Sequence, residues 1–209
     1  RVYNDTVMTF EQHLVSEYFK HKSIDQVFKV HNYDLPISFA SYHRVLNKFG
    51  VIKSAGPNSK LSESLELLSL INTYKLPLER IYHQHAPASL QISTNTMHRI
   101  LHHIRLGITR RVGTALVITN PKFPNQYLVG QDQSLTKSNL GRKGDWSLPM
   151  GYTREQDTHQ MSIKRVLQQE VFTDLIINNK FPKLKLRSKY IFTINIADIK
   201  FYVYHLEIS

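Results

Sequence analysis

The sequence predicts an α+β fold in which an all-helical region precedes a region of mixed strands and helices. Up to Gly107 the apolar residues recur every three or four positions, as they do on the buried face of a helix. From about Gly113 short β-branched runs alternate with turn residues, which is typical of strands. The stretch GITRRVG (107–113) therefore marks the boundary between the two regions.

The first part of the helical region is predicted to contain three helices. A long amphipathic helix spans Thr9–Lys22, and a shorter one spans Ser23–His31 with its serine as the N-cap. After the turn NYDLP (32–36), a third helix spans Ser38–Gly50. Its first serine is expected to cap it, and its last glycine is expected to close it in the left-handed conformation.

A second unit repeats this order. Its expected helices span Ser62–Leu76, Pro77–His85 and Ser93–Gly107, and the segment YHRVL (42–46) aligns with MHRIL (97–101). Repetition of one supersecondary unit counts for more than either copy alone. The chain is therefore divided into two helical units and a C-terminal domain, at residues 1–60, 61–111 and 112–209.

The order of the helices in each unit is that of a helix-turn-helix or winged-helix-like domain. The third helix would bury an apolar face from Phe39 to Phe49 and turn polar and basic side chains outward, as a recognition helix needs in a major groove. The alternative is a packing module whose outer face is only solvated. The candidate nucleic-acid contacts are Ser41, His43, Arg44, Asn47 and Lys48, then Asn95, His98, Arg99, His102 and Arg105, and Arg110 and Arg111 at the boundary.

The composition favours a polyanionic partner. Lysine and arginine number 27 against 16 acids, for a net charge of +11, and both regions share the excess. Nucleic acid is the expected partner, DNA in preference to RNA, although a basic protein without such a partner is the alternative. The absence of cysteine excludes thiolate chemistry and fits a reducing cytoplasm, nucleus or organelle matrix. No apolar run approaches the roughly 18 residues of a membrane span, so no membrane partner is expected.

The C-terminal region is expected to form a sheet around one main helix. Alternation and turn residues predict short strands, and the helix begins at Asp157 or Thr158 as its cap. The expected elements are strands in Thr114–Pro121 and Gln126–Gln131, a strand that enters a turn in DWSLPMGY (145–152), a helix at Thr158–Val171, and a hairpin in Lys185–Ser209 that turns near 197–198.

The stretch WSLPMGYTREQDTHQMSIKRVLQQE (146–170) resembles the signature box of the Nudix family. That box is a glycine, five residues, a glutamate, seven residues and then Arg-Glu-aliphatic-x-Glu-Glu-x-Gly-aliphatic. The resemblance covers about residues 112–209, and it implies an α/β/α sandwich that would continue past Ser209 with a further strand and helix. The residues that carry the resemblance are Trp146, Gly151, Asp157, Arg165, Gln169 and Glu170.

The acidic part of this box is depleted. Val166 and Gln169 stand where two glutamates belong, and Glu170 keeps the last one. The resemblance implies that acids on this helix face hold Mg²⁺ against a diphosphate, and Mg²⁺ requires oxygen ligands. We therefore expect catalysis to be lost or severely weakened. Glu170 is the residual catalytic and metal candidate, and no cofactor is expected unless the chain is an enzyme that uses Mg²⁺.

Two further sets of basic residues have alternative interpretations. Arg165 is expected either to tie the helix to the preceding loop through Asp157 or Glu155 or to be a surface charge. In strand geometry the basic residues of 180–189 would share one face, as a solvated edge or as a stripe that binds phosphates. The members of that stripe are Lys183, Lys185, Arg187 and Lys189.

These observations favour a non-catalytic nucleic-acid-binding protein of a regulatory, transcriptional or chromosomal assembly. The Nudix-like domain would then sense a ligand or dock a protein. One alternative is a divergent Nudix hydrolase of a nucleoside diphosphate derivative or an RNA cap. The other is a structural subunit of a ribonucleoprotein.

Overall fold

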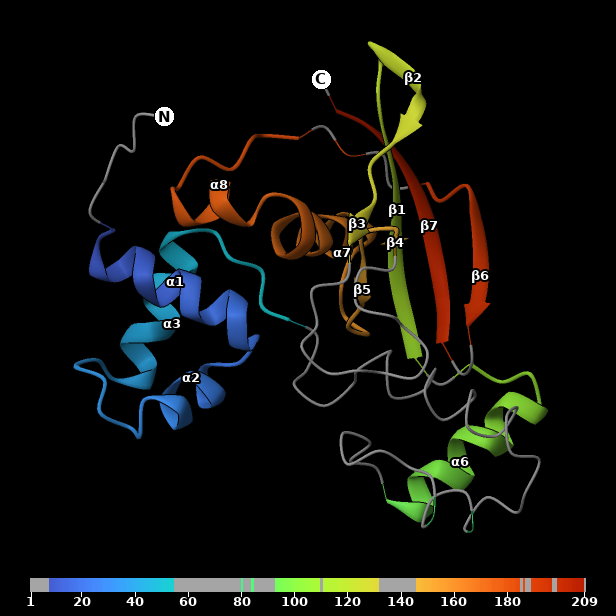
Figure 1. Cartoon of the computed structure of the whole chain (residues 1–209), viewed down its shortest axis with the longest axis horizontal. Helices are drawn as coiled ribbons and strands as arrows, with labels where there is room; N and C mark the ends of the chain where they lie inside the picture. The colour runs from blue at the N-terminus through green and yellow to red at the C-terminus, as the bar shows by residue number, and fades with distance from the viewer. Residues whose placement is uncertain are drawn as a thin grey trace.

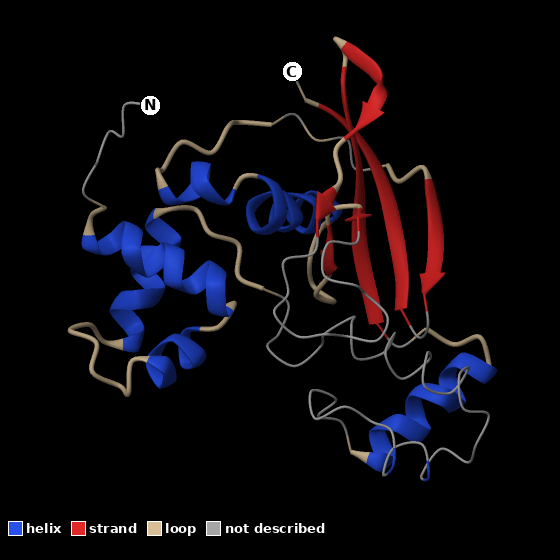
Figure 2. Ribbon diagram, in the orientation of Figure 1, coloured by secondary structure: helices blue, strands red, loops and turns tan. Residues whose placement is uncertain are grey.

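The structure is a computed structural model that describes residues 8–54, 80, 84, 93–109, 111–131, 146–184, 186, 189–196 and 199–208. It is an α+β protein with a curled, mixed sheet. An N-terminal group of helices lies to one side, and further helices stand between it and the sheet (Figures 1 and 2). Among the described residues, no helix is long and apolar enough to cross a membrane.

The N-terminal unit contains the three helices that the sequence predicts: α1 (Phe10–His21), α2 (Ile24–Val30) and α3 (Phe39–Lys48). A capping box begins α1, because the Thr9 side chain accepts from the backbone N–H of Gln12 and the Gln12 side chain accepts from that of Thr9. The serine before α2 occupies the N-cap position, but its side chain makes no capping hydrogen bond.

The core of this unit is completed by a helix from the C-terminal region. Leu14 of α1 and Tyr42 of α3 are fully buried, and the Tyr42 hydroxyl donates to the Leu14 carbonyl at 2.6 Å. Ile176 and Ile177 of α8 (Thr173–Ile177) belong to the same buried cluster. The C-terminal region therefore contributes α8 to the hydrophobic core of the N-terminal unit.

One residue of the α3 core face differs from expectation. Tyr42, Val45, Leu46 and Phe49 are buried, as predicted, but Phe39 is 39% exposed. Phe39 is the first residue of α3 and stacks on the ring of Phe28, with centroids 4.0 Å apart, so it covers the core from outside.

The second unit is described mainly at its third helix, α6 (Thr94–Arg105). Its other two expected helices lie outside the described residues, apart from Arg80 and Gln84, which are both helical. In Figure 1, α6 lies beyond the end of the sheet at which β1 and β7 begin.

The main sheet has the order β2-β1-β7-β6, and β5 also pairs with β1. The long strands β1 and β7 are parallel in register from Arg111↔Ile199 to Thr119↔Glu207, and the other pairs are antiparallel. The strands are β1 (Arg111–Asn120), β2 (Phe123–Tyr127), β5 (Met150–Tyr152), β6 (Phe192–Ile196) and β7 (Ile199–Glu207).

Three strand predictions need correction, and the hairpin prediction is confirmed. The single strand expected in residues 145–152 is two short strands in different sheets, β4 (Trp146–Ser147) and β5. The strand expected at Gln126–Gln131 is two strands, because β2 ends at Tyr127 and β3 (Gly130–Gln131) pairs instead with β4 (Trp146–Ser147). The hairpin of β6 and β7 pairs Ile196 with Ile199, around the expected turn. Its first arm begins at Phe192, and the described residues between 185 and 191 are in no strand.

The main helix α7 (His159–Val166) packs on one face of the sheet and continues as the π-helix η1 (Leu167–Val171). Thr158 rather than Asp157 caps α7, since its hydroxyl accepts from the N–H of Met161 at 3.2 Å. The buried residues of this side are Leu116, Ile118, Ile163, Val166, Leu167, Tyr204 and Leu206.

On the opposite face of the sheet, Gly113 of β1 lies against the ring of Phe201. A Cβ added at Gly113 would clash with that ring. A glycine at this position therefore makes room for a buried aromatic side chain of β7.

Candidate functional site

The segment that resembles the Nudix box is held together by a buried ion pair. Arg165 Nη2 donates to Asp157 Oδ1 at 2.7 Å, Nη1 donates to Oδ2, and the side chains are only 2% and 4% exposed. Burial alone would raise the pKa of Asp157, but hydrogen bonds from Arg165 and from the backbone of Arg154 lower it below its usual value. Arg165 thus ties the helix to the loop through Asp157, and the surface-charge interpretation is wrong.

The positions of the box glutamates do not form one exposed face. Val166 is 1% exposed and packs against Gly151. If Gly151 carried a Cβ, that atom would lie 3.4 Å from Val166 Cγ2. From Leu167 the helix widens to π geometry, so the residues that follow leave the α-helical spacing. Gln169 is half-buried and Glu170 is exposed.

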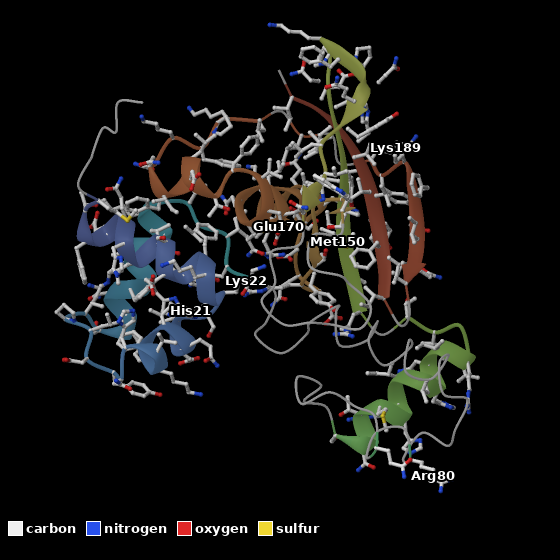
Figure 3. All side chains as sticks on the ribbon, in the orientation of Figure 1. His21, Lys22, Arg80, Met150, Glu170 and Lys189 are labelled. Carbon is white, nitrogen blue, oxygen red and sulfur yellow. The ribbon has the colours of Figure 1, made fainter. Side chains whose placement is uncertain are left out.

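Glu170, the residual catalytic and metal candidate, faces the N-terminal unit. Its carboxylate accepts from Lys22 Nζ, at the end of α1, at 3.0 Å. Both residues are labelled in Figure 3. Within the described ranges, no group of three or more His, Asp or Glu is placed to hold a metal ion. The carboxylate that the sequence suggested for Mg²⁺ is thus an interdomain ion-pair partner.

The same helix holds the strap, as we call residues 50–54 that follow α3. Gln168 is 3% exposed, and its Nε2 donates to the Gly50 carbonyl at 2.9 Å while its Oε1 accepts from the Ile52 N–H at 2.8 Å. Arg165 Nε donates to the Lys53 carbonyl at 2.7 Å. Gln168 was not a candidate from the sequence, because it occupies a variable position of the box and nothing local marks it.

A second arginine of the loop before α7 also reaches the strap. Arg154 Nη2 donates to the Ser54 carbonyl, and the Ser54 N–H donates to the Tyr18 hydroxyl of α1 at 2.9 Å. The strap is therefore bonded on one side to the C-terminal region and on the other to the N-terminal unit.

On α3, several candidate nucleic-acid contacts are already engaged. Lys48 pairs with Glu11 at 2.6 Å, and His43 Nδ1 accepts from Lys53 Nζ at 2.6 Å. Burial, and then the charge of Lys53, lower the pKa of His43. The Ser41 hydroxyl bonds to that of Ser38 in the cap. Of the five candidates on this helix, Arg44 and Asn47 are exposed, and their side chains make no hydrogen bond or ion pair with the rest of the described chain.

On α6 the candidate contacts are all exposed. They come from successive turns of one helix whose apolar side, at Met97 and Ile100, is buried. The residues are Asn95, His98, Arg99, His102 and Arg105, of which His98 already has a partner within the chain.

The remaining candidates are scattered. Arg111 is half-buried, with its guanidinium 5.1 Å from the centre of the Tyr152 ring, and Arg110 lies outside the described residues. The strand-face prediction for the basic stripe is wrong at Lys183 and Lys189, which are exposed in irregular backbone. Lys185 and Arg187 are not among the described residues, and Trp146 is 68% exposed on β4.

A cleft of about 570 Å³ lies over the sheet beside the start of α7. Val112 and Thr114 of β1 and Tyr202 and Tyr204 of β7 line it from the sheet, and His159 lines it from α7. The loop 153–157 borders it on another side. Arg111, a candidate nucleic-acid contact from the sequence, also lines the cleft, and Asp157 is a residue of the Nudix-like motif; the other lining residues are not candidates from the sequence.

No family model matches this chain. No curated protein matches it either. Function is therefore inferred from the geometry of the described residues.

Proposed function

We propose that this chain is a non-catalytic, nucleic-acid-binding protein that contacts DNA rather than RNA through helix-turn-helix-like units. In this proposal the Nudix-like domain is a docking module within a regulatory or chromosomal assembly. The observation that carries the proposal is the correspondence between α3 and α6.

The two helices share their beginnings and ends as well as their sequence pattern. Ser38 and Ser93 each accept from the backbone N–H three residues on, at 3.2 Å in both cases. Gly50 and Gly107 follow the helices with the same left-handed φ of 66°. After each glycine, a backbone N–H donates to the carbonyl five residues earlier: Val51 to Leu46 and Ile108 to His103. These shared features support the interpretation of α3 and α6 as equivalent helices in two copies of one unit.

Each copy presents an arginine at the equivalent position. Arg44 and Arg99 are exposed, and neither guanidinium makes a hydrogen bond or an ion pair with the described part of the chain. A guanidinium with free donors suits a phosphate or a guanine edge. The net charge of +11 adds a general attraction for a polyanion.

The geometry of the C-terminal region supports a non-catalytic role. Val166 is in the core, Gln169 is neutral, and the Glu170 carboxylate is neutralised by Lys22. Recruiting Mg²⁺ to Glu170 would require breaking that ion pair and would still supply one carboxylate. The bonds of Gln168 and Arg165 to the strap instead support a docking role for this helix.

The test compares two double variants of equal charge. Arg44→Ala with Arg99→Ala removes the equivalent arginines, whereas Lys122→Ala with Lys180→Ala removes two exposed cations from other surfaces. Affinity for duplex DNA and RNA is measured by fluorescence anisotropy between about 50 and 200 mM salt. The arginine variant should weaken binding and reduce the slope of log affinity against log salt by roughly 2.

The lysine variant should change that slope much less. Equal effects of the two double variants would mean that only net charge matters, and the assignment of α3 and α6 would be wrong. Absence of binding by the unmodified chain at the lowest salt would remove the nucleic-acid proposal altogether.

A further inference from the structure

The cleft beside α7 has the size of a small-molecule site. Its volume of about 570 Å³ falls within the roughly 300–1,000 Å³ of such sites. Its floor is a single face of the sheet, because Thr114 pairs with Tyr202 and Val112 with Lys200 in the parallel register of β1 and β7. Tyr202 makes this face aromatic. Its ring contacts the His159 ring edge-on, with the ring centroids 5.8 Å apart.

The polar groups of the cleft are mainly hydrogen-bond donors. Arg154 is exposed at the rim, and a guanidinium has no acceptor. The hydroxyls of Thr114 and Thr153 lie 3.0 Å apart, so their mutual bond uses one hydroxyl hydrogen and leaves the other for a ligand. Burial raises the pKa of Tyr204 to about 12, so its hydroxyl stays protonated and can donate to His159 Nδ1. An imidazole whose Nδ1 accepts carries its hydrogen on Nε2, so His159 has that N–H for a ligand.

The acceptors of the cleft are few. Asp157 lines it, but both carboxylate oxygens are taken by Arg165. Glu155 is the other carboxylate of the lining, and it is exposed. A ligand that brings several acceptor oxygens and negative charge matches this set of donors better than a cation or a neutral apolar molecule does.

Arg154 also connects the cleft to the N-terminal unit. One of its terminal nitrogens donates to the Ser54 carbonyl in the strap, so the other donors of the guanidinium are left to bind a ligand. A ligand that immobilises the Arg154 guanidinium would also stabilise its hydrogen bond to the Ser54 carbonyl. The bonds of Gln168 and Tyr18 to Ile52 and Ser54 would then open less often.

We propose that the cleft binds a small oxyanion, a carboxylate or phosphate compound, through Arg154, His159 and the Thr114–Thr153 pair. Binding there strengthens the attachment of the strap to the C-terminal region. This inference goes beyond nucleic-acid binding and does not depend on it.

The test measures anion binding and strap protection on the full chain, without nucleic acid. Inorganic phosphate and citrate are titrated separately by calorimetry at constant ionic strength, and potassium chloride serves as the control for salt. The two titrations distinguish a phosphate ligand from a carboxylate ligand. Amide hydrogen exchange at Ile52 and Ser54 should slow when the site is saturated, and amides near Lys122, at the far end of β1, should not change.

Three variants decide the outcome. Arg154→Met should weaken binding of the anion by about tenfold or more, because it removes a charged hydrogen-bond donor. Lys122→Met, which removes an exposed cation far from the cleft, should not. Glu155→Gln should tighten binding, because it removes the repelling carboxylate.

Several results would overturn the proposal. These are no binding of either anion, wild-type affinity in Arg154→Met, or saturable binding that leaves exchange at Ile52 and Ser54 unchanged. If Arg154→Met does not fold, Glu155→Gln decides alone, and unchanged affinity in that variant refutes the site. Nucleic-acid binding is measured with other variants, so either proposal can fail without the other.

Discussion

Two neighbouring glutamines of η1 should respond oppositely to the same substitution. Gln168 satisfies two backbone groups of the strap, the Gly50 carbonyl and the Ile52 N–H. Gln169, by contrast, has a buried Nε2 with no hydrogen-bond partner among the described residues. Replacement of each by leucine keeps a similar volume and removes the amide.

The expected magnitudes follow from which groups lose a partner. Gln168→Leu leaves two backbone groups without their partner: the N–H of half-buried Ile52 and the carbonyl of exposed Gly50. An unsatisfied buried group costs about 1–3 kcal/mol, and the carbonyl costs less because water reaches it, so the sum is roughly 2–4 kcal/mol. Gln169→Leu removes an amide that was already unsatisfied, and it should be neutral or stabilising by up to about 1 kcal/mol.

The assay is urea unfolding of both variants beside the unmodified chain, with thermal unfolding as a second measure. For a chain of this length, Gln168→Leu should lower Tm by roughly 4–16 °C, since each kcal/mol corresponds to about 2–4 °C. Gln169→Leu should leave Tm unchanged or raise it. If Gln168→Leu costs no more than Gln169→Leu, the strap is not held by this side chain and the docking interpretation of the helix fails.

Three other substitutions test separate contacts. Gly113→Ala should destabilise by about 1–3 kcal/mol in urea unfolding, because its Cβ would meet the buried Phe201 ring, and a neutral result would show that the ring can move. Asp157→Asn should cost about 3–5 kcal/mol at neutral pH, because it leaves Arg165 buried without its charge partner. Since the folded state lowers the pKa of Asp157, its contribution is present above the ordinary pKa of about 3.9 and is lost as pH falls through the lower folded value. Stability curves of the variant and the unmodified chain should therefore converge below about pH 4, and a constant difference down to pH 2 would contradict the ion pair. Glu170→Gln should cost less than about 1 kcal/mol, because its ion pair with α1 is partly exposed, and a larger loss would mean that this pair is a main contact between the regions.

The ends of the helices could be predicted from the sequence, because capping is a local property. A serine that accepts from the N–H three residues on needs only its own turn of backbone, and the structure has this bond at Ser38 and Ser93. The glycines that follow these helices are equally local, since left-handed backbone favours glycine wherever it occurs. The turn of the β6–β7 hairpin was also predicted, from the alternation on either side of it.

The candidate site could be predicted only in part. The spacing of Asp157 and Arg165 allowed an ion pair, but only burial of both side chains decides between a buried tie and two surface charges. For Arg44 and Lys48 the helical period correctly indicates outward positions. The period does not indicate whether such a side chain is already paired. Lys48 forms an ion pair because Glu11, which lies on another helix, is within reach.

What the sequence by itself determined is the local pattern: where helices begin and end, the two periods, and Val166 and Gln169 at positions where the Nudix box would have glutamates. The tertiary structure decided what these residues contact. Glu170 pairs with Lys22 and Gln168 bonds to Gly50 and Ile52 across 116 residues or more of chain, so no local pattern could reveal either contact. The physical reason is that a carboxylate or an amide takes the nearest suitable partner in space, and the packing of α8 on the N-terminal unit determines which partner that is.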